Sequence, residues 1–266
     1  SDEALIEEGS LVDINYVKAN RRNYIITMGV DWNRDKVGTR IIVVALDKST
    51  HRYHIIHKDR VATMGWTQIA AVDAIVSANQ IYDVDHVYVD DGHGDMQTSA
   101  LRKIGEQALI QHGVGHPTVR LMDTKAVMFG SALVLVDPVS NEEFRRPTKQ
   151  YMVEHTALLL GRGNLVLLSE ADNDIVVQLK NYVVKSISAK GLKTYTTKNP
   201  QIGDHDLDAY MLALHAIHQE YSEYAGNAPV GTVLCLFNNP LQGEVAQDTS
   251  EDYAIIGMSS NVVLNT

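Results

Sequence analysis

Acidic residues end two apolar segments of the sequence, where a strand would present them at the edge of a sheet. Asp31 lies at the end of YIITMGVDW (24–32), and Asp90 and Asp91 close HVYVDD (86–91). Side chains alternate along a strand, so Asp90 shares a face with Tyr88, and Asp91 lies on the other face. Spacing alone does not choose between Asp90 and Asp91, but each segment offers a carboxylate at a strand end.

A third acidic group, DHDLD at 204–208, begins the clearest helical pattern of the sequence. On a helix, Asp204 and Asp208 are four residues apart and His205 and Asp208 are three apart, so one helix face can present them together. Asp204 also suits an N-cap, and Asp206 suits the positive end of the helix dipole. Which of Asp204, His205 and Asp206 acts with Asp208 therefore stays open at this stage.

These residue types are the ligands of hard divalent cations. Mg²⁺ prefers carboxylate oxygens, and Mn²⁺ also accepts an imidazole. Two such ions roughly 3.5–4 Å apart activate a water and stabilise the leaving oxygen in phosphodiester hydrolysis. Singly, each acid has an ordinary role in a turn or a cap. Together they repel one another unless cations lie among them, so the three groups predict a metal site.

The elements that must hold these groups alternate between strands and helices. We predict strands at 24–32, 39–47 and 51–60, a helix at 66–82, a strand at 86–91 and a helix near 96–111. A fifth strand at 118–122 and a polar loop to about Arg146 follow, then a helix at 147–160 that starts on Pro147. The last elements are a strand at 164–168, a helix at 172–182, a hairpin of 183–188 with 193–197, and a helix at 204–221. This order predicts a mixed α/β sheet with helices on both faces.

The order of these motifs resembles a known family. MGVDW, HVYVDDGHGDMQ, the segment from KQYMVEH to LKNYVV, and TYTTKNPQIGDHDLDAYMLALHAI are similar to the C-terminal nuclease domain of the large terminase subunits of tailed double-stranded DNA bacteriophages. The resemblance covers about residues 24–221. It implies a ribonuclease H-like fold, shared with Holliday-junction resolvases, and metal-dependent endonucleolytic cleavage of concatemeric viral DNA in the host cytoplasm during virus assembly.

The resemblance also implies roles for individual residues. Asp31 and Asp90 match the first and second metal-ligand positions, and Asp208 of the Asp208–Ala209 pair matches the third. His205 stands where the family often has a second acid, which suggests that two metals bind unequally and that Mn²⁺ is preferred. The implied partners are double-stranded DNA, an ATPase motor domain of the same polypeptide, a small terminase subunit and a portal protein. The implied catalytic residues are Asp31, Asp90, His205 and Asp208, and the metal ligands add Asp91 and Asp204 to these four.

Composition limits the other possibilities. The chain has 266 residues, one cysteine and a formal net charge of -10, and no apolar run is long enough for a membrane span. Cys235 cannot form an internal disulfide, and no G-x-x-x-x-G-K-[ST] phosphate loop is present, so an ATPase motor lies outside this sequence. We expect an acidic lead-in at 1–23, a nuclease domain at 24–222 and an acidic tail at 223–266.

The negative charge does not exclude DNA as a substrate, because it gathers at the two ends of the chain. Residues 14–198 hold 23 basic against 19 acidic residues. Basic residues in or beside the long loop and the hairpin are candidates for contacts with the DNA backbone, and His93 is a candidate for a contact with phosphate. These basic candidates are Lys125, Arg145, Arg146, Lys149, Lys185, Lys190, Lys193 and Lys198.

Two alternatives to a terminase nuclease share the expected fold. One is a resolvase-like or transposase-like nuclease, which acts on branched DNA or on strand ends. The other is a DNA-docking or assembly module whose nuclease site is silent without its motor.

Overall fold

The computed structural model describes residues 12–33, 37–61, 64–92, 94–136, 141–167 and 173–221. The predictions for the first 11 residues, for His93, and for the tail after Tyr221 with Cys235 lie outside these residues.

A six-stranded mixed sheet forms the centre of the fold, with the order β5-β4-β1-β2-β3-β8. β1 (Tyr24–Asp31), β2 (Arg40–Asp47) and β3 (Arg52–Arg60) are antiparallel neighbours, and β4 (His86–Asp90) runs parallel to β1. β5 (Lys125–Val127) and β8 (Leu165–Val166) extend the two edges in parallel with their neighbours. Three antiparallel strands followed by parallel strands on the other side of β1 are the ribonuclease H-like arrangement, so the predicted fold class is confirmed.

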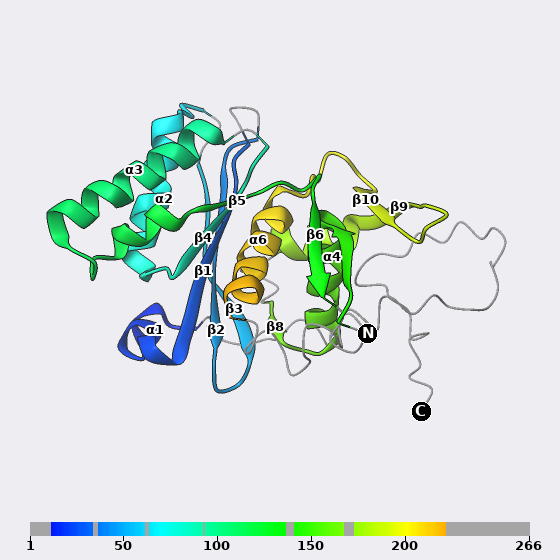
Figure 1. Ribbon diagram of the computed structural model, residues 1–266, viewed down its shortest axis with the longest axis horizontal. Helices are drawn as coiled ribbons and strands as arrows, with labels where there is room; N and C mark the ends of the chain where they lie inside the picture. Colours follow the sequence, from blue (N-terminus) through cyan, green and yellow to red (C-terminus); the bar gives the residue numbers. More distant parts are fainter. Residues whose placement is uncertain are drawn as a thin grey trace.

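Helices cover both faces of this sheet (Figure 1). α2 (Gln68–Tyr82) and α3 (Asp95–His112) lie on one side, and α6 (His205–Glu220) lies on the other, with α4 (Thr148–Gly161) and α5 (Asn173–Asn181) beyond it. Alternation along β1 divides its side chains between two cores: Met28 and Val30 pack in the core on the α2 side, and Ile25 packs in the core that contains α6. Every residue of α6 from Leu207 to His218 is buried, as expected for a helix between the sheet and a further helix layer.

Gly29 sets how closely α6 approaches the sheet. A Cβ atom at this position would lie 1.9 Å from the carbonyl oxygen of Ala209 and 2.5 Å from the backbone nitrogen of Ala213. Thr27, two residues earlier on the same face, donates its hydroxyl to the carbonyl of Ala213 at 2.8 Å. The absence of a side chain at Gly29 therefore lets the first half of α6 lie directly over the end of β1.

The structure corrects three of the predicted elements. Residues 118–122 are not a strand: the 3₁₀ helix η3 (Pro117–Asp123) covers them, with Pro117 at its start and His116 Nδ1 accepting from the Thr118 N–H at 3.3 Å. The predicted loop before Arg146 contains a hairpin of β6 (Ala132–Val136) and β7 (Glu143–Pro147), in which the apolar ALVLV run forms a strand. Regular structure begins before Tyr24, with α1 (Ile14–Ala19) and η2 (Arg21–Asn23). The other predicted strands and helices are present, including the hairpin of β9 (Tyr182–Ile187) and β10 (Lys193–Thr197).

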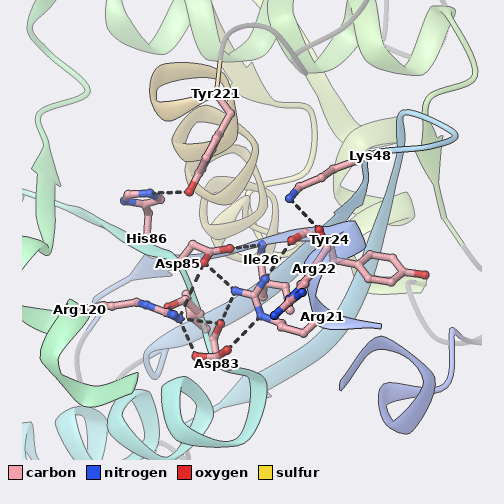
Figure 2. Close-up of polar contacts among 11 residues, drawn as sticks. Arg21, Arg22, Tyr24, Ile26, Lys48, Asp83, Asp85, His86, Arg120 and Tyr221 are labelled. Carbon is pink, nitrogen blue, oxygen red and sulfur yellow. Dashed lines mark hydrogen bonds and ion pairs between the residues drawn. The ribbon is translucent and has the colours of Figure 1, made fainter. Parts of the chain in front are cut away.

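A polar network fixes the opposite end of β1 from Asp31 (Figure 2). Asp85 accepts the backbone N–H of Ile26 at 2.9 Å and pairs with Arg21 at 2.6 Å. Asp83, the left-handed residue after α2, pairs with Arg21 at 3.2 Å and with Arg120 at 2.6 Å. These contacts hold the start of β1, the α2–β4 turn and η3 together.

Among the described helices, none is both long and apolar enough to cross a membrane.

Candidate active site

Asp31 and Asp90 lie side by side at one edge of the sheet. The parallel register pairs Val30 with Val89, so the next residue of each strand is an aspartate, on strands about 4.8 Å apart. Asp31 shares its face with Thr27 and Gly29, which contact α6, and Asp90 shares its face with Tyr88, which packs with α6 residues. Alternation carries Asp91 to the opposite face. The geometry thus favours Asp90 over Asp91 as the partner of Asp31.

The first residue of α6 lies directly against Asp31. His205 Nδ1 is 2.9 Å from Asp31 Oδ2, and Asp31 itself is buried. The hydrogen bond to Asp31 raises the pKa of His205, although burial opposes this. An Nδ1–H that donates to a carboxylate leaves Nε2 with its lone pair, the arrangement in which an imidazole binds a metal. Gly203, at φ +70°, comes close to the ring: a Cβ there would lie 3.3 Å from His205 Cδ2.

Asp208 lies one helical turn further into the molecule and contacts Lys149 of α4. Lys149 Nζ forms an ion pair with Asp208 Oδ1 and lies 4.3 Å from the centre of the Phe129 ring. Burial raises the pKa of Asp208 to about 7; Lys149 opposes this rise, and the charges of Asp204 and Asp31 add to it. The carboxylates of α6 and β1 are therefore close enough to interact, in a place where burial disfavours their charge.

The two other acids at the start of α6 have different surroundings. Asp204 occupies the N-cap position, but its side chain makes no capping hydrogen bond, and its charge raises the pKa values of His205 and Asp208. Asp206 instead pairs with Arg40 Nε at 3.2 Å and accepts from Gln178 at 2.7 Å. Of the two, Asp204 remains the candidate for the site, and Asp206 holds neighbouring elements together.

The donor atoms suit a divalent cation, since carboxylate oxygens and an imidazole are ligands that Mg²⁺ and Mn²⁺ accept. However, among the described residues no group of three or more His, Cys, Asp or Glu side chains is gathered closely enough to hold a metal ion. The ion pair with Lys149 occupies the Asp208 carboxylate, whereas the contact of His205 Nδ1 with Asp31 leaves Nε2 available. Cation binding by Asp208 would need its contact with Lys149 to rearrange.

Three of the proposed DNA contacts form ion pairs within the protein. Arg146 is buried and pairs with Glu154 at 2.9 Å, Lys193 pairs with the same carboxylate at 3.4 Å, and Lys149 pairs with Asp208. Carboxylates of α4 and α6 thus hold these three cations, and their contacts with DNA stay predictions. Arg145, Lys185, Lys190 and Lys198 are exposed and stay predictions, and Lys125, which pairs with Glu220, is half-exposed.

Sequence reasoning missed residues that contact the candidate ligands. Asn33 Nδ2 lies 2.9 Å from His205 Nδ1, and Arg40 binds Asp206. Arg40 could have been found from strand pairing, because an antiparallel β1–β2 hairpin places it opposite Asp31. Asn33 has no comparable signal, since its contact depends on where α6 packs.

No family model matches the sequence, and no curated protein matches it. Similar solved structures include large terminase nucleases. The one from thermophilic phage G20c is 17% identical with a TM-score of 0.47, over 76% of this chain and 84% of that one. The nuclease domain from Thermus phage P74-26 is 18% identical with a TM-score of 0.46, over 78% and 84%.

A third similar structure is the large terminase nuclease domain of bacteriophage SPP1 with bound Mn, at 16% identity and a TM-score of 0.44, over 79% of this chain and 94% of that one. These are domains of the family that the sequence resembles. At such identities the likeness concerns the fold alone.

Proposed function

We propose that this chain is the metal-dependent DNA endonuclease domain of a viral DNA-packaging terminase, which cuts concatemeric double-stranded DNA in the host cytoplasm. The observation that carries the proposal is the Asp31–His205 contact at 2.9 Å, at a sheet edge where Asp90 is adjacent and Asp208 and Asp204 are close enough to interact. The sequence resemblance extends the proposal to the partners: a motor domain, a small subunit and a portal protein.

In this proposal Asp31, Asp90, His205 and Asp208 hold the cations, with Asp204 in support. Mg²⁺ or Mn²⁺, as one or two ions, would supply Lewis-acid stabilisation of the charge that develops on a phosphodiester. Asp31 orients His205 through the Nδ1 contact, so that Nε2 carries the free lone pair. Burial around Asp208 keeps bulk water from screening the charges that act on the substrate.

Incubation of the protein with supercoiled plasmid DNA and Mn²⁺ or Mg²⁺, at a concentration on the order of millimolar, tests this function. We expect the parent protein to nick or linearise the plasmid and Asp31→Asn to lose this activity by about 100-fold or more. Asp73→Asn is the matched control, because Asp73 is exposed on α2, on the other face of the sheet. A parent protein that leaves the plasmid intact, or an Asp31→Asn variant that cuts it normally, would refute the proposal.

One observation favours the alternative of a DNA-docking module with a silent site. The Lys149–Asp208 ion pair already neutralises one candidate ligand, and the described residues hold no preformed three-ligand group. Such a module would bind DNA in the presence of metal without turnover. Comparing linear with four-way-branched DNA as substrates separates the resolvase-like alternative, which prefers the branched form.

A further inference from the structure

A row of charged residues crosses the end of the sheet that carries Asp31. The residues of β4 and β1 in this row are negative, and those of β2 and β3 are positive. Strand pairing places Arg40 opposite Asp31, and Arg60 opposite Arg40. Directly opposed residues of antiparallel strands point to the same face, so both arginines lie on the α6 face with Asp31. From β4 to β3 the row reads Asp90, Asp31, Arg40, Arg60, with about 10 Å between the β1 and β3 positions.

Arg40 is buried and retains an unused hydrogen-bond donor. Only 8% of the residue is exposed, and its Nε pairs with Asp206, which Gln178 also holds. Neither Nε nor Nη1 forms a hydrogen bond with the described residues, so the contact of Nε with Asp206 is an ion pair only. A guanidinium stays protonated even when buried, and an unsatisfied charged donor is costly, so a site that keeps one is suited to an anionic ligand.

The row borders a cleft of about 690 Å³ beside His205. Arg40, Lys58 and Arg60 line it together with Gly203 and the first residues of α6. Lys58 lies opposite Ile42 in the register of β2 and β3, and Ile42 packs in the core on the α6 side. Lys58 therefore also lies on the α6 face.

Three acids also border the cleft: Asp59, Asp174 and Asp206. The side chain of Asp206 is occupied by Arg40 and Gln178. Alternation places the side chain of Asp59 on the opposite face of β3. Burial lowers the pKa of His57 there, and the charge of Asp59 opposes this. Burial raises the pKa of Tyr82, and the charge of Asp59 adds to this rise. Arg40, Lys58 and Arg60 thus bring three cations to the cleft, where Asp174 remains beside them and Asp206 is already paired.

We propose that this cleft is a phosphate subsite, in which Arg40, Lys58 and Arg60 bind the DNA backbone phosphate next to the one placed at Asp31. The assignment of DNA as the ligand rests on the proposed function. Arginine binds phosphate through paired N–H donors, and Asp206 acts as a positioning residue that fixes the plane of the Arg40 guanidinium. The subsite would set which phosphodiester of a bound strand reaches the acids.

Binding of a fluorescent 20-base-pair duplex without divalent metal tests the subsite separately from cleavage. Titrations between about 50 and 200 mM salt give the affinity and its salt dependence, whose slope falls by roughly one for each phosphate contact removed. We expect Arg60→Gln and Lys58→Gln each to weaken binding about 3-fold to 10-fold and to lower the slope by about one. Lys103→Gln, exposed on α3 across the sheet, is the charge-matched control.

Arg40→Gln should weaken binding further, and Arg40→Lys should restore part of the affinity. Circular dichroism shows whether the Arg40 variants fold, and Arg60→Gln keeps the test valid if they do not. A parent protein that fails to bind the duplex, or an Arg60→Gln variant with unchanged affinity and slope, would overturn the subsite. Loss of cleavage on Asp31→Asn tests the proposed function instead, so the two failures are distinguishable.

Discussion

Lys149 of α4 places its ammonium group against the carboxylate of Asp208 on α6, from 59 positions earlier in the chain. Tyr182 of β9 lies behind the pair, with its ring centre 5.7 Å from the ammonium nitrogen. Burial disfavours the charge of Lys149, but the neighbouring Asp208 outweighs this and raises the pKa of the ammonium group. The pair therefore links the α4 layer to the candidate active site.

Removing only the cation of this pair should destabilise the fold. Lys149→Met leaves Asp208 buried beside Asp204 and Asp31, and we expect a loss of about 3 kcal/mol in the free energy of unfolding at pH 8. The double variant Lys149→Met/Asp208→Asn should recover most of the loss, because no buried charge is left alone. Urea denaturation measures both. A double variant less stable than Lys149→Met would contradict this account.

Gly29 should tolerate no side chain. A methyl group there meets the backbone of α6 rather than a flexible side chain, so Gly29→Ala should cost about 3 kcal/mol or more. Gly161→Ala, at the end of α4, meets no atom within 4 Å and should be neutral or slightly stabilising. Thermal melting of the two variants compares them, and equal melting temperatures would show that α6 does not depend on Gly29.

A cluster of buried histidines predicts a loss of stability in acid. His155 of α4 and His218 of α6 have ring centres 4.5 Å apart, and Tyr151 packs against both and against His215. Burial lowers the pKa of His215 to about 3 and of His218 to about 4, and burial lowers that of His155 well below 6.5.

These histidines are neutral in the folded state, whereas the unfolded chain takes up protons below about pH 6.5. Their contribution is complete above pH 6.5 and falls as the pH decreases, by up to ~1.4 kcal/mol per pH unit for each histidine. Urea denaturation at pH 7, 6 and 5 measures the slope, which His218→Leu should reduce. Leu214→Met, on the same helix, should keep it. An unchanged slope in His218→Leu would mean that other groups cause the acid sensitivity.

The network in Figure 2 predicts a distinct role for Asp85. Asp85→Ala removes both the acceptor for the Ile26 N–H and a partner of Arg21, and we expect a loss of about 2 kcal/mol. Asp85→Asn keeps an acceptor for the backbone and should lose about half as much. Chemical denaturation with and without 1 M NaCl separates the two parts, because salt weakens the ion pair more than the backbone hydrogen bond. Equal losses for Ala and Asn would contradict the backbone contact.

Much of the fold follows from local patterns in the sequence. Apolar and β-branched runs predicted β1 and β2, alternation predicted β3, and helical spacing predicted α2, because these patterns act over a few neighbouring residues. The predicted strand at 118–122 is wrong because a short apolar run suits either a strand or a tight helix, and Pro117 with the His116 contact favours the helix.

The sequence by itself placed Asp31 and Asp90 at strand ends and the acidic group at the start of α6, since each lies next to an apolar segment whose direction is fixed. Only the tertiary structure decided what each acid touches. His205, Asp206 and Asp208 belong to one helical turn, but their side chains contact different partners. Asp206 contacts Arg40, Asp208 contacts Lys149, and His205 contacts Asp31. The reason is physical: the direction of a side chain on α6 is local, but its partner comes from whichever distant strand or helix packs there, and the close approach at Gly29 selects those partners.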